Sequence, residues 1–306
     1  MELHGFVNID KPLGWTSHDI VGRLRRILGT RKIGHAGTLD PAATGVLIAG
    51  VGRATRFLDY VQYESKSYLA HVVLGVGSES SDIDGRVLTR SETANADNPP
   101  SRADIELILP EFIGDIDQVP PKYSAIKQDG EPIYRKMRRG EDVDVPVRQV
   151  RVDAIEVLEY SPPDLVLAVD CGSGVYIRSL ARDIAERLGT EGYLHHLVRT
   201  RVGQFDLSST FDIHALGEME FPQSWTSVAT AIDIGIGHLP AVVVNGDDRI
   251  AWYHGRSIHA RSGSAGEMGE PVRVLAGDGS FVGLATPENS GAAGIVLRPR
   301  IVVPQH

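Results

Sequence analysis

The chain has 306 residues, of which 42% are hydrophobic and one is a cysteine, and its formal net charge is −9. This length and apolar content suffice for one large domain or two domains with substantial cores. The single cysteine excludes an internal disulfide and a thiolate metal cluster, and the acidic balance argues against a protein that coats nucleic acid non-specifically.

The apolar runs and the distribution of charge indicate where the protein is located and what kind of partner it binds. No apolar run approaches the length of a membrane span, and the amino terminus does not read as a secretory leader. We therefore expect a cytoplasmic protein that has no membrane partner. Residues 1–56 hold eight Lys or Arg against four Asp or Glu, a local +4, so the remainder carries −13. An acidic body with a basic face suits an enzyme that approaches one folded RNA and releases it.

The amino-terminal segment predicts a strand, a turn and a helix. Phe6 to Ile9 is a short apolar run, and the turn after it ends at Gly14. Thr16 and Asp19 have the spacing of a capping box. The apolar positions that follow share one helix face before Gly29: Ile20, Val21, Leu24, Ile27 and Leu28.

The next segment, GHAGTLDPAATGVL, is centred on one acidic residue, Asp40, which is followed by Pro41. A carboxylate on a short turn, without a partner carboxylate or metal ligands nearby, suggests a nucleophile. Asp-Pro is also a common way to begin a turn. The local residues alone leave both interpretations open.

The middle of the chain mixes strand and helix signals without regular alternation. We expect strands and helices in this order: strand Val46 to Val51, helix Arg53 to Val61, strand Ser67 to Val76, a helix that starts at Ser101, strands Val150 to Leu158 and Leu165 to Val169, and helix Tyr176 to Leu188. This order predicts an α+β fold with a mixed, largely antiparallel sheet and flanking helices. Cys171 is expected to be a small buried residue at a strand end.

From Leu239 the composition changes to short apolar runs separated by Gly-rich or polar turns. The runs are Ala241 to Asn245, Ser257 to Ala260, Val272 to Ala276, Phe281 to Ala285 and Ile295 to Arg298. Short strands with such punctuation predict a small β barrel. We therefore expect a catalytic domain over residues 1–238 and a second domain over residues 239–306.

Five segments carry a resemblance to one family. They are Gly5 to Val21, Gly34 to Leu47, Lys66 to Gly85, Val119 to Gly140 and Cys171 to Gly189. In this order they resemble the TruB-type bacterial tRNA pseudouridine-55 synthases. One departure is Ala36, where the family more often has a hydroxyl residue.

The resemblance implies a pseudouridine synthase fold followed by a PUA-like RNA-binding domain. It also implies a monomeric enzyme that isomerises uridine 55 in the T loop of tRNA, without a guide RNA and without a cofactor. On this basis the basic residues beside the Asp40 turn become candidates for RNA contact, although a charged helix face is usually only solvated. They are Arg23, Arg25, Arg26, Arg31 and Lys32.

The resemblance also assigns site residues. Asp40 matches the family's nucleophile, Arg178 the arginine that pairs with it, and Tyr68 the active-site tyrosine. Burial alone would raise the pKa of a nucleophilic carboxylate, and a fixed guanidinium would keep the carboxylate ionised. The expected substrate-binding residues are His35, Lys11, Lys66, Tyr176 and Leu197; His35 would help to extract the uridine from its stack. No metal is expected, because His195 and His196 are adjacent rather than four residues apart.

Two other classes compete with this interpretation. A non-catalytic RNA-binding or RNA-folding protein could use the same cleft and carboxy-terminal domain, but it would not need a carboxylate at Asp40 facing phosphate-rich RNA. A retaining glycosidase could use Asp40 as nucleophile, but the sequence shows no second carboxylate in a matching motif. Without the resemblance, Tyr68 would be read as a packed strand tyrosine and His35 as a structural histidine.

Overall fold

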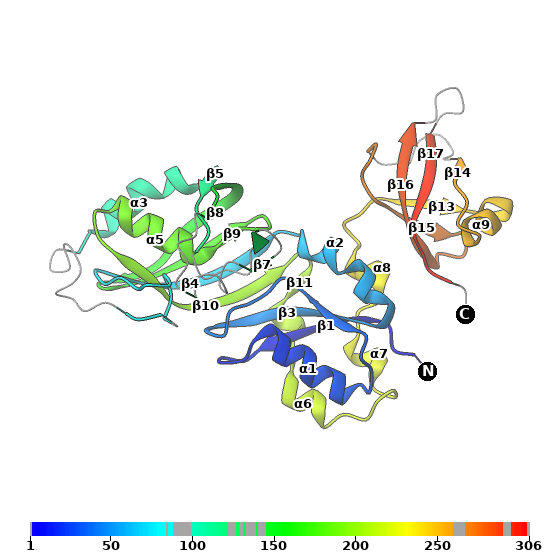
Figure 1. Ribbon diagram of the computed structural model, residues 1–306, viewed down its shortest axis with the longest axis horizontal. Helices are drawn as coiled ribbons and strands as arrows, with labels where there is room; N and C mark the ends of the chain where they lie inside the picture. Colours follow the sequence, from blue (N-terminus) through cyan, green and yellow to red (C-terminus); the bar gives the residue numbers. More distant parts are fainter. Residues whose placement is uncertain are drawn as a thin grey trace.

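The computed structural model describes residues 2–83, 85–87, 99–121, 127–128, 131–132, 139, 145–259, 267–289 and 295–304. Most of the segment from Val119 to Gly140 lies outside these ranges. The main feature of the molecule is a ten-stranded mixed sheet (Figure 1). Eight of its strands follow the order β12-β1-β3-β10-β4-β9-β8-β5, while β11 pairs with β10 and β2 pairs with β3. The strands are β1 (Gly5–Lys11), β2 (Ile33–Ala36), β3 (Ala43–Val51), β4 (Lys66–Leu74), β5 (Gly114–Gln118), β8 (Arg148–Ser161), β9 (Asp164–Cys171), β10 (Gly192–Val202), β11 (Phe205–Asp206) and β12 (Phe211–Asp212).

Most neighbouring strands of this sheet are antiparallel, whereas β1 with β12 and β10 with β3 are parallel. The expected α+β class with a largely antiparallel sheet is therefore confirmed. Cys171 ends β9 and is buried, as expected. No helix of the described residues is long and apolar enough to cross a membrane.

Three helices cover the sheet through the apolar faces expected from the sequence. They are α1 (Ser17–Ile27), α3 (Arg102–Ile108) and α5 (Ile177–Arg187). Capping boxes at Thr16 and Ser101 start the first two, so four otherwise unpaired polar groups are satisfied. The buried apolar residues of α1 and α5 join one hydrophobic core with Tyr68, Ala70, Val72 and Leu74 of β4.

Shorter elements connect these layers. They are η1 (Gly52–Phe57), α2 (Leu58–Gln62), η3 (Leu109–Phe112), β6 (Lys127–Gln128), β7 (Glu131–Pro132), η4 (Leu207–Ser209), α6 (Ile213–Gly217), α7 (Trp225–Val228) and α8 (Ile232–Gly235). The single helix expected from Arg53 to Val61 is thus a 3-10 helix followed by one short α-helix. The 3-10 helix η1 begins at Gly52, and the φ of +62° at this residue does not fit an α-helix.

A second, five-stranded sheet follows in the order β13-β15-β16-β17-β14, with α9 (Gly246–Tyr253) beside it. Its strands are β13 (Ala241–Val244), β14 (Ile258–His259), β15 (Val272–Ala276), β16 (Phe281–Asn289) and β17 (Ile295–Val302). They match the five expected runs, and the small second sheet domain is confirmed; α9 was not expected. Trp252 of α9 is fully buried in the core of this sheet.

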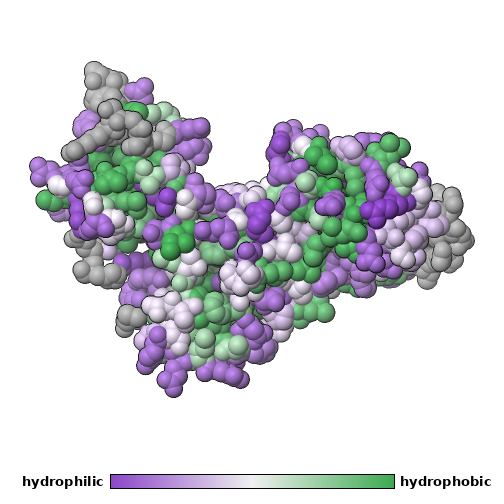
Figure 2. Space-filling model, turned by 180° about the vertical axis from the view of Figure 1, so that it is seen from behind, coloured by the Kyte–Doolittle hydropathy of each residue, from purple (hydrophilic) through white to green (hydrophobic). Residues whose placement is uncertain are grey.

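The second sheet packs against η1 and α2 through a shared apolar cluster. Phe57 lies edge-to-face with Phe281 at a ring distance of 5.6 Å, and Leu284 and Ile301 lie in the same cluster as Phe57. The guanidinium of Arg300 lies 5.8 Å from the centre of the Tyr60 ring. The space-filling view shows a hollow between the second sheet domain and the opposite lobe of the molecule (Figure 2).

Candidate active site

A cleft of about 480 Å³ lies between the Asp40 turn, the middle strands of the large sheet and the start of α5. This volume is in the range of small-ligand pockets. Six of the eight residues proposed from the sequence line it: Asp40, Lys66, Tyr68, Tyr176, Arg178 and Leu197. The other two, Lys11 and His35, lie next to the Asp40 turn in the strands β1 and β2.

The Asp40 turn is held by hydrogen bonds to the segment that starts α1. Ser17 Oγ donates to the carbonyl of Leu39 and accepts from its N–H, at 3.2 and 2.9 Å. The N–H of Gly14 donates to the carbonyl of Pro41 at 2.8 Å. These bonds fix the backbone on both sides of Asp40, whose side chain is 43% exposed. The turn therefore presents a carboxylate at a defined position.

Arg178 connects Asp40 to a second carboxylate that the sequence did not single out. Its Nε lies 3.1 Å from Asp40 Oδ2, and its Nη1 lies 2.8 Å from Asp82 Oδ2. The side chains of Arg178 and Asp82 are only 8% and 7% exposed. A cation in the first turn of α5 is disfavoured by the helix dipole, and the two carboxylates offset this cost.

Asp82 lies in a turn rich in serine and glycine, where an acidic residue is ordinary; only its place in a segment resembling the family could have marked it. The structure fixes the turn against β10, since the N–H of Leu194 donates to the carbonyl of Ser81 at 3.0 Å. Ser80 Oγ donates to Asp82 Oδ1. The carboxylate is thereby aimed at Arg178.

Tyr68 and Arg199 form a buried pair behind the Asp40 turn. They are cross-strand neighbours on β4 and β10 and are 7% and 1% exposed. Burial raises the pKa of Tyr68, the positive charge of Arg199 opposes this rise, and the charge of Asp40 adds to it. Arg199 also donates to the carbonyls of Val46 and Gly37 at 2.7 and 3.1 Å. At neutral pH the Tyr68 hydroxyl therefore keeps its proton.

Two buried lysines donate to backbone carbonyls around the cleft. Lys11 Nζ reaches the carbonyls of Trp15 at 2.6 Å, Pro12 at 3.1 Å and Pro41 at 3.5 Å. Lys66 Nζ donates to one carbonyl at the end of α2 and one in the loop that follows. Burial, with a smaller contribution from the positive charge of Arg199, lowers the pKa of Lys66 to about 8. In these positions both ammonium groups hold loops that shape the cleft.

His35 is neutral in the folded protein. Burial lowers its pKa to about 4, with smaller contributions from the charges of His18 and Arg199. The His35 and His18 rings meet edge-to-face at 5.4 Å. Its Nδ1 is buried without a hydrogen-bond partner among the described residues.

Tyr176 is fixed through its backbone at the start of α5. The side-chain amide of Gln118 accepts from its N–H at 2.8 Å and donates to its carbonyl at 3.1 Å. Leu197, on β10, supplies an apolar wall that is 9% exposed. No group of three His, Cys, Asp or Glu side chains within the described ranges could hold a metal ion.

Comparison of the sequence with known proteins identifies the family to which the chain belongs. The sequence model of the TruB family pseudouridylate synthase, N-terminal domain, matches residues 25–177. A tRNA pseudouridine synthase B of Leifsonia xyli subsp. xyli is 42% identical over 284 residues, 92% of this chain and 91% of the relative. One of Trichormus variabilis is 39% identical over 269 residues, covering 87% and 89%.

Two solved structures share the fold over nearly the whole chain. A Cbf5-Nop10-Gar1 complex gives a TM-score of 0.76 at 26% identity, covering 97% of this chain and 84% of that one. An H/ACA RNP bound to a substrate RNA containing 2'-deoxyuridine gives 0.73 at 25% identity, covering 98% and 85%.

Proposed function

The chain belongs to the TruB family and is a pseudouridine synthase acting on tRNA; from this premise we propose that it isomerises uridine 55 of the T loop, with Asp40 as the nucleophile. The reaction breaks the bond between ribose C1′ and base N1 and forms one between C1′ and C5. The proton lost from C5 is balanced by the proton gained at N1. Electrons are neither gained nor lost, so the chemistry needs a nucleophile, a proton acceptor and a pocket that retains the detached base.

The pairing of Asp40 with Arg178 is the observation that carries the proposal. A nucleophilic carboxylate must be ionised, and burial opposes ionisation. The buried guanidinium 3.1 Å away stabilises the charged form, while the carboxylate keeps 43% of its surface open toward the cleft. Asp40 is thus charged, fixed and accessible, as attack on a flipped-out uridine requires.

Tyr68 fits the role of a wall for the base. Its ring lines the cleft beside Asp40, and its raised pKa makes the hydroxyl a hydrogen-bond donor rather than a phenolate at neutral pH. Stacking of the uracil on this ring would keep the base in place while it turns. Leu197 supplies a second apolar surface of the same cleft.

For the RNA partner we propose the T stem-loop of tRNA, bound by a monomer without a guide RNA. The curated relatives are named for tRNA alone. Lys66 and Lys11 act through the loops they hold. Of the basic residues beside the Asp40 turn, Arg25, Arg26, Arg31 and Lys32 are exposed at the surface, where phosphates could reach them. We place the boundary between the catalytic and the RNA-binding domain near residue 239.

The proposal is tested with a T-loop hairpin that carries tritium at uridine C5. Asp40→Asn should release no label, because C5 loses its hydrogen only when it bonds to C1′, while hairpin binding stays within about tenfold of wild type, roughly 1.4 kcal/mol. Asp117→Asn, which neutralises an exposed carboxylate on β5, is the matched control and should release label normally. Normal release by the Asp40 variant would remove the nucleophile assignment.

A further inference from the structure

Tyr63 is an exposed aromatic residue at the edge of the cleft. It follows the last residue of α2, its side chain is 71% exposed, and it lines the same cleft as Asp40 and Tyr68. An isolated exposed apolar side chain needs no explanation on an ordinary surface. Here the surrounding loop is fixed to an unusual degree.

Lys66 holds the carbonyl groups of the residues on either side of Tyr63. Its Nζ donates to the carbonyl of Gln62 at 2.7 Å and to the carbonyl of Glu64 at 2.8 Å. Lys66 is 6% exposed, and burying an ammonium group costs free energy that the lowered pKa reflects. The fold therefore uses a buried cation to fix the backbone on either side of an exposed ring.

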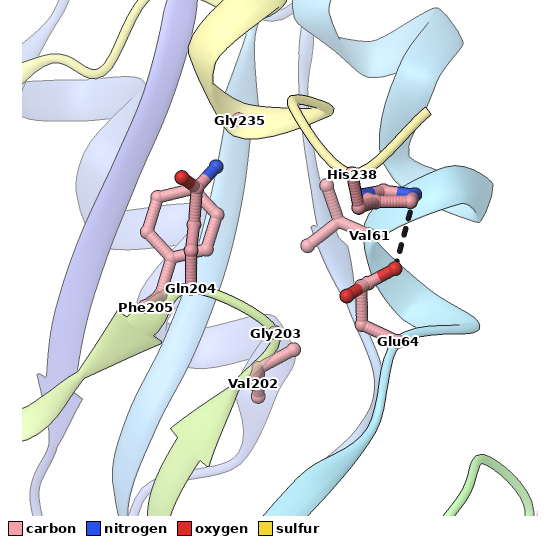
Figure 3. Close-up of a pocket in the computed structure, with 8 residues that line it drawn as sticks. All are labelled: Val61, Glu64, Val202, Gly203, Gln204, Phe205, Gly235 and His238. Atoms are coloured by element: carbon pink, nitrogen blue, oxygen red, sulfur yellow. Dashed lines mark ion pairs between the residues drawn. The ribbon is translucent and has the colours of Figure 1, made fainter. Parts of the chain in front are cut away.

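The next two residues are anchored from the other side of the loop. Glu64 Oε1 lies 3.0 Å from Nε2 of His238, in the segment that leads to the second sheet (Figure 3). The carbonyl and Oγ of Ser65 accept from the N–H of Gly203 at 2.9 Å and from Arg201 Nη1 at 3.0 Å. Gly203 has a φ of +52°, and a Cβ there would come within 2.9 Å of side-chain atoms of Glu64, so this close approach favours glycine.

From this arrangement we propose that Tyr63 is a stacking platform for a nucleotide next to the target uridine. The inference rests on the proposed function, because a uridine that leaves its stack exposes the faces of its neighbours. Proteins bind such unstacked bases on aromatic rings. A ring on a fixed loop loses little conformational freedom on binding, so its stacking energy is retained as affinity.

Substitution of Tyr63 separates stacking from chemistry. Tyr63→Ala should weaken binding of the T-loop hairpin by about ten- to a hundredfold, with a much smaller change in the single-turnover rate at saturating RNA. Tyr63→Phe and Tyr63→Trp should restore the affinity, because they keep an aromatic face. Leu107→Ala, which removes a 77% exposed side chain from α3, is the matched control and should bind normally.

The contact itself is tested with hairpins that have an abasic site on the 5′ or the 3′ side of the target. One of these two abasic hairpins should bind wild type and the Tyr63→Ala variant with equal affinity, because it lacks the base that would stack on Tyr63. Equal losses for Tyr63→Ala in all hairpins, or no loss in the intact one, would overturn the inference. Tritium release by wild type is measured separately. If wild type releases label, a negative binding result contradicts only the role of Tyr63. If wild type releases no label, the proposed function is wrong.

Discussion

Arg178 contacts two carboxylates that differ in exposure, and the difference divides their roles. Asp82 is buried and points at Nη1, whereas Asp40 reaches Nε and faces the cleft. A guanidinium with two fixed donors can satisfy both at once, and a lysine ammonium lacks this planar geometry. Asp82 therefore acts as a positioning residue that holds Arg178 where Asp40 needs it.

Replacing Asp82 with asparagine should lower both stability and activity. The amide leaves a buried guanidinium with weaker compensation, so the free energy of unfolding should fall by about 3 kcal/mol. Urea denaturation measures this change, and tritium release at saturating hairpin should show a lower rate. Asp153→Asn, which breaks an exposed ion pair with Arg151, should leave the free energy of unfolding nearly unchanged, because solvent screens exposed pairs. Equal effects of the two substitutions would contradict the positioning role.

His35 gives the folded protein a specific dependence on pH. Its folded pKa of about 4 lies below the ordinary value of 6.5, so the unfolded chain binds a proton first as the pH falls. The contribution of the neutral His35 ring to the free energy of unfolding is therefore fully present above pH 6.5 and is lost as the pH falls from 6.5 to 4. Allowing for the partial exposure of the ring, the loss should be about 2 kcal/mol.

The measurement compares wild type with His35→Gln, because the glutamine does not titrate and other groups cancel. The difference in free energy of unfolding between the two proteins should shift against wild type as the pH falls from 7 to 4. Parallel stability curves over this range would show that His35 is not neutral by burial.

At the scale of single residues, sequence reasoning finds groups whose type and motif match a chemistry and misses those defined by burial. Asp40, Tyr68 and Arg178 were proposed from motifs, and the structure brings them into one cleft. Arg199 was not proposed, because nothing in its sequence context distinguishes a buried arginine from an exposed one. Asp82 was missed because an acidic residue is ordinary in a turn rich in serine and glycine.

Elements with a single clear periodicity were predictable. The capping boxes and apolar faces of α1 and α3 and the long stripe of α5 appear where the sequence indicated. These helices bury one face on the sheet and expose the other, so their pattern repeats every three to four residues. The starts of α1 and α3 agree because capping side chains mark them. The start of α5 has no side-chain cap, and its apolar stripe alone indicated it.

The central strand β10 was missed although it joins the two halves of the sheet between β3 and β4. Register shifts occur after Leu194 and after Arg199 in its pairing with β4. Each shift changes which side chains face the core, so the alternation of apolar and polar residues is interrupted. The same strand carries Leu197 and Arg199 into the cleft, so the irregular element is also the functional one.

At the scale of the whole molecule, the second sheet is less independent than the sequence suggests. Arg53 and Arg56 donate to the carbonyls of Pro304 and Val302 at 3.4 Å each, beside the contact between Phe57 and Phe281. These contacts fall on η1, which leads directly into α2. Tyr63 and Lys66, just after α2, line one wall of the cleft. Non-local contacts of this kind leave no pattern in either segment alone.

A chain that ends at Leu239 tests how the two sheets share their work. It should fold, because the large sheet has its own core, but with a lower melting temperature, because Phe57 and Val61 lose the cover of Leu284 and Ile301. Circular dichroism would record the fold and the shift in melting temperature.

The same shortened chain should keep most of its single-turnover rate at saturating RNA, since every proposed chemical residue precedes Gly203. Binding of full-length tRNA should weaken more than binding of an isolated T-loop hairpin, which offers less RNA to a distant module. If the folded chain bound the hairpin normally but lost the chemical step, the second sheet would have to position the α2 wall of the cleft. In that case restoring the covering contacts, rather than RNA contacts, would be what activity requires.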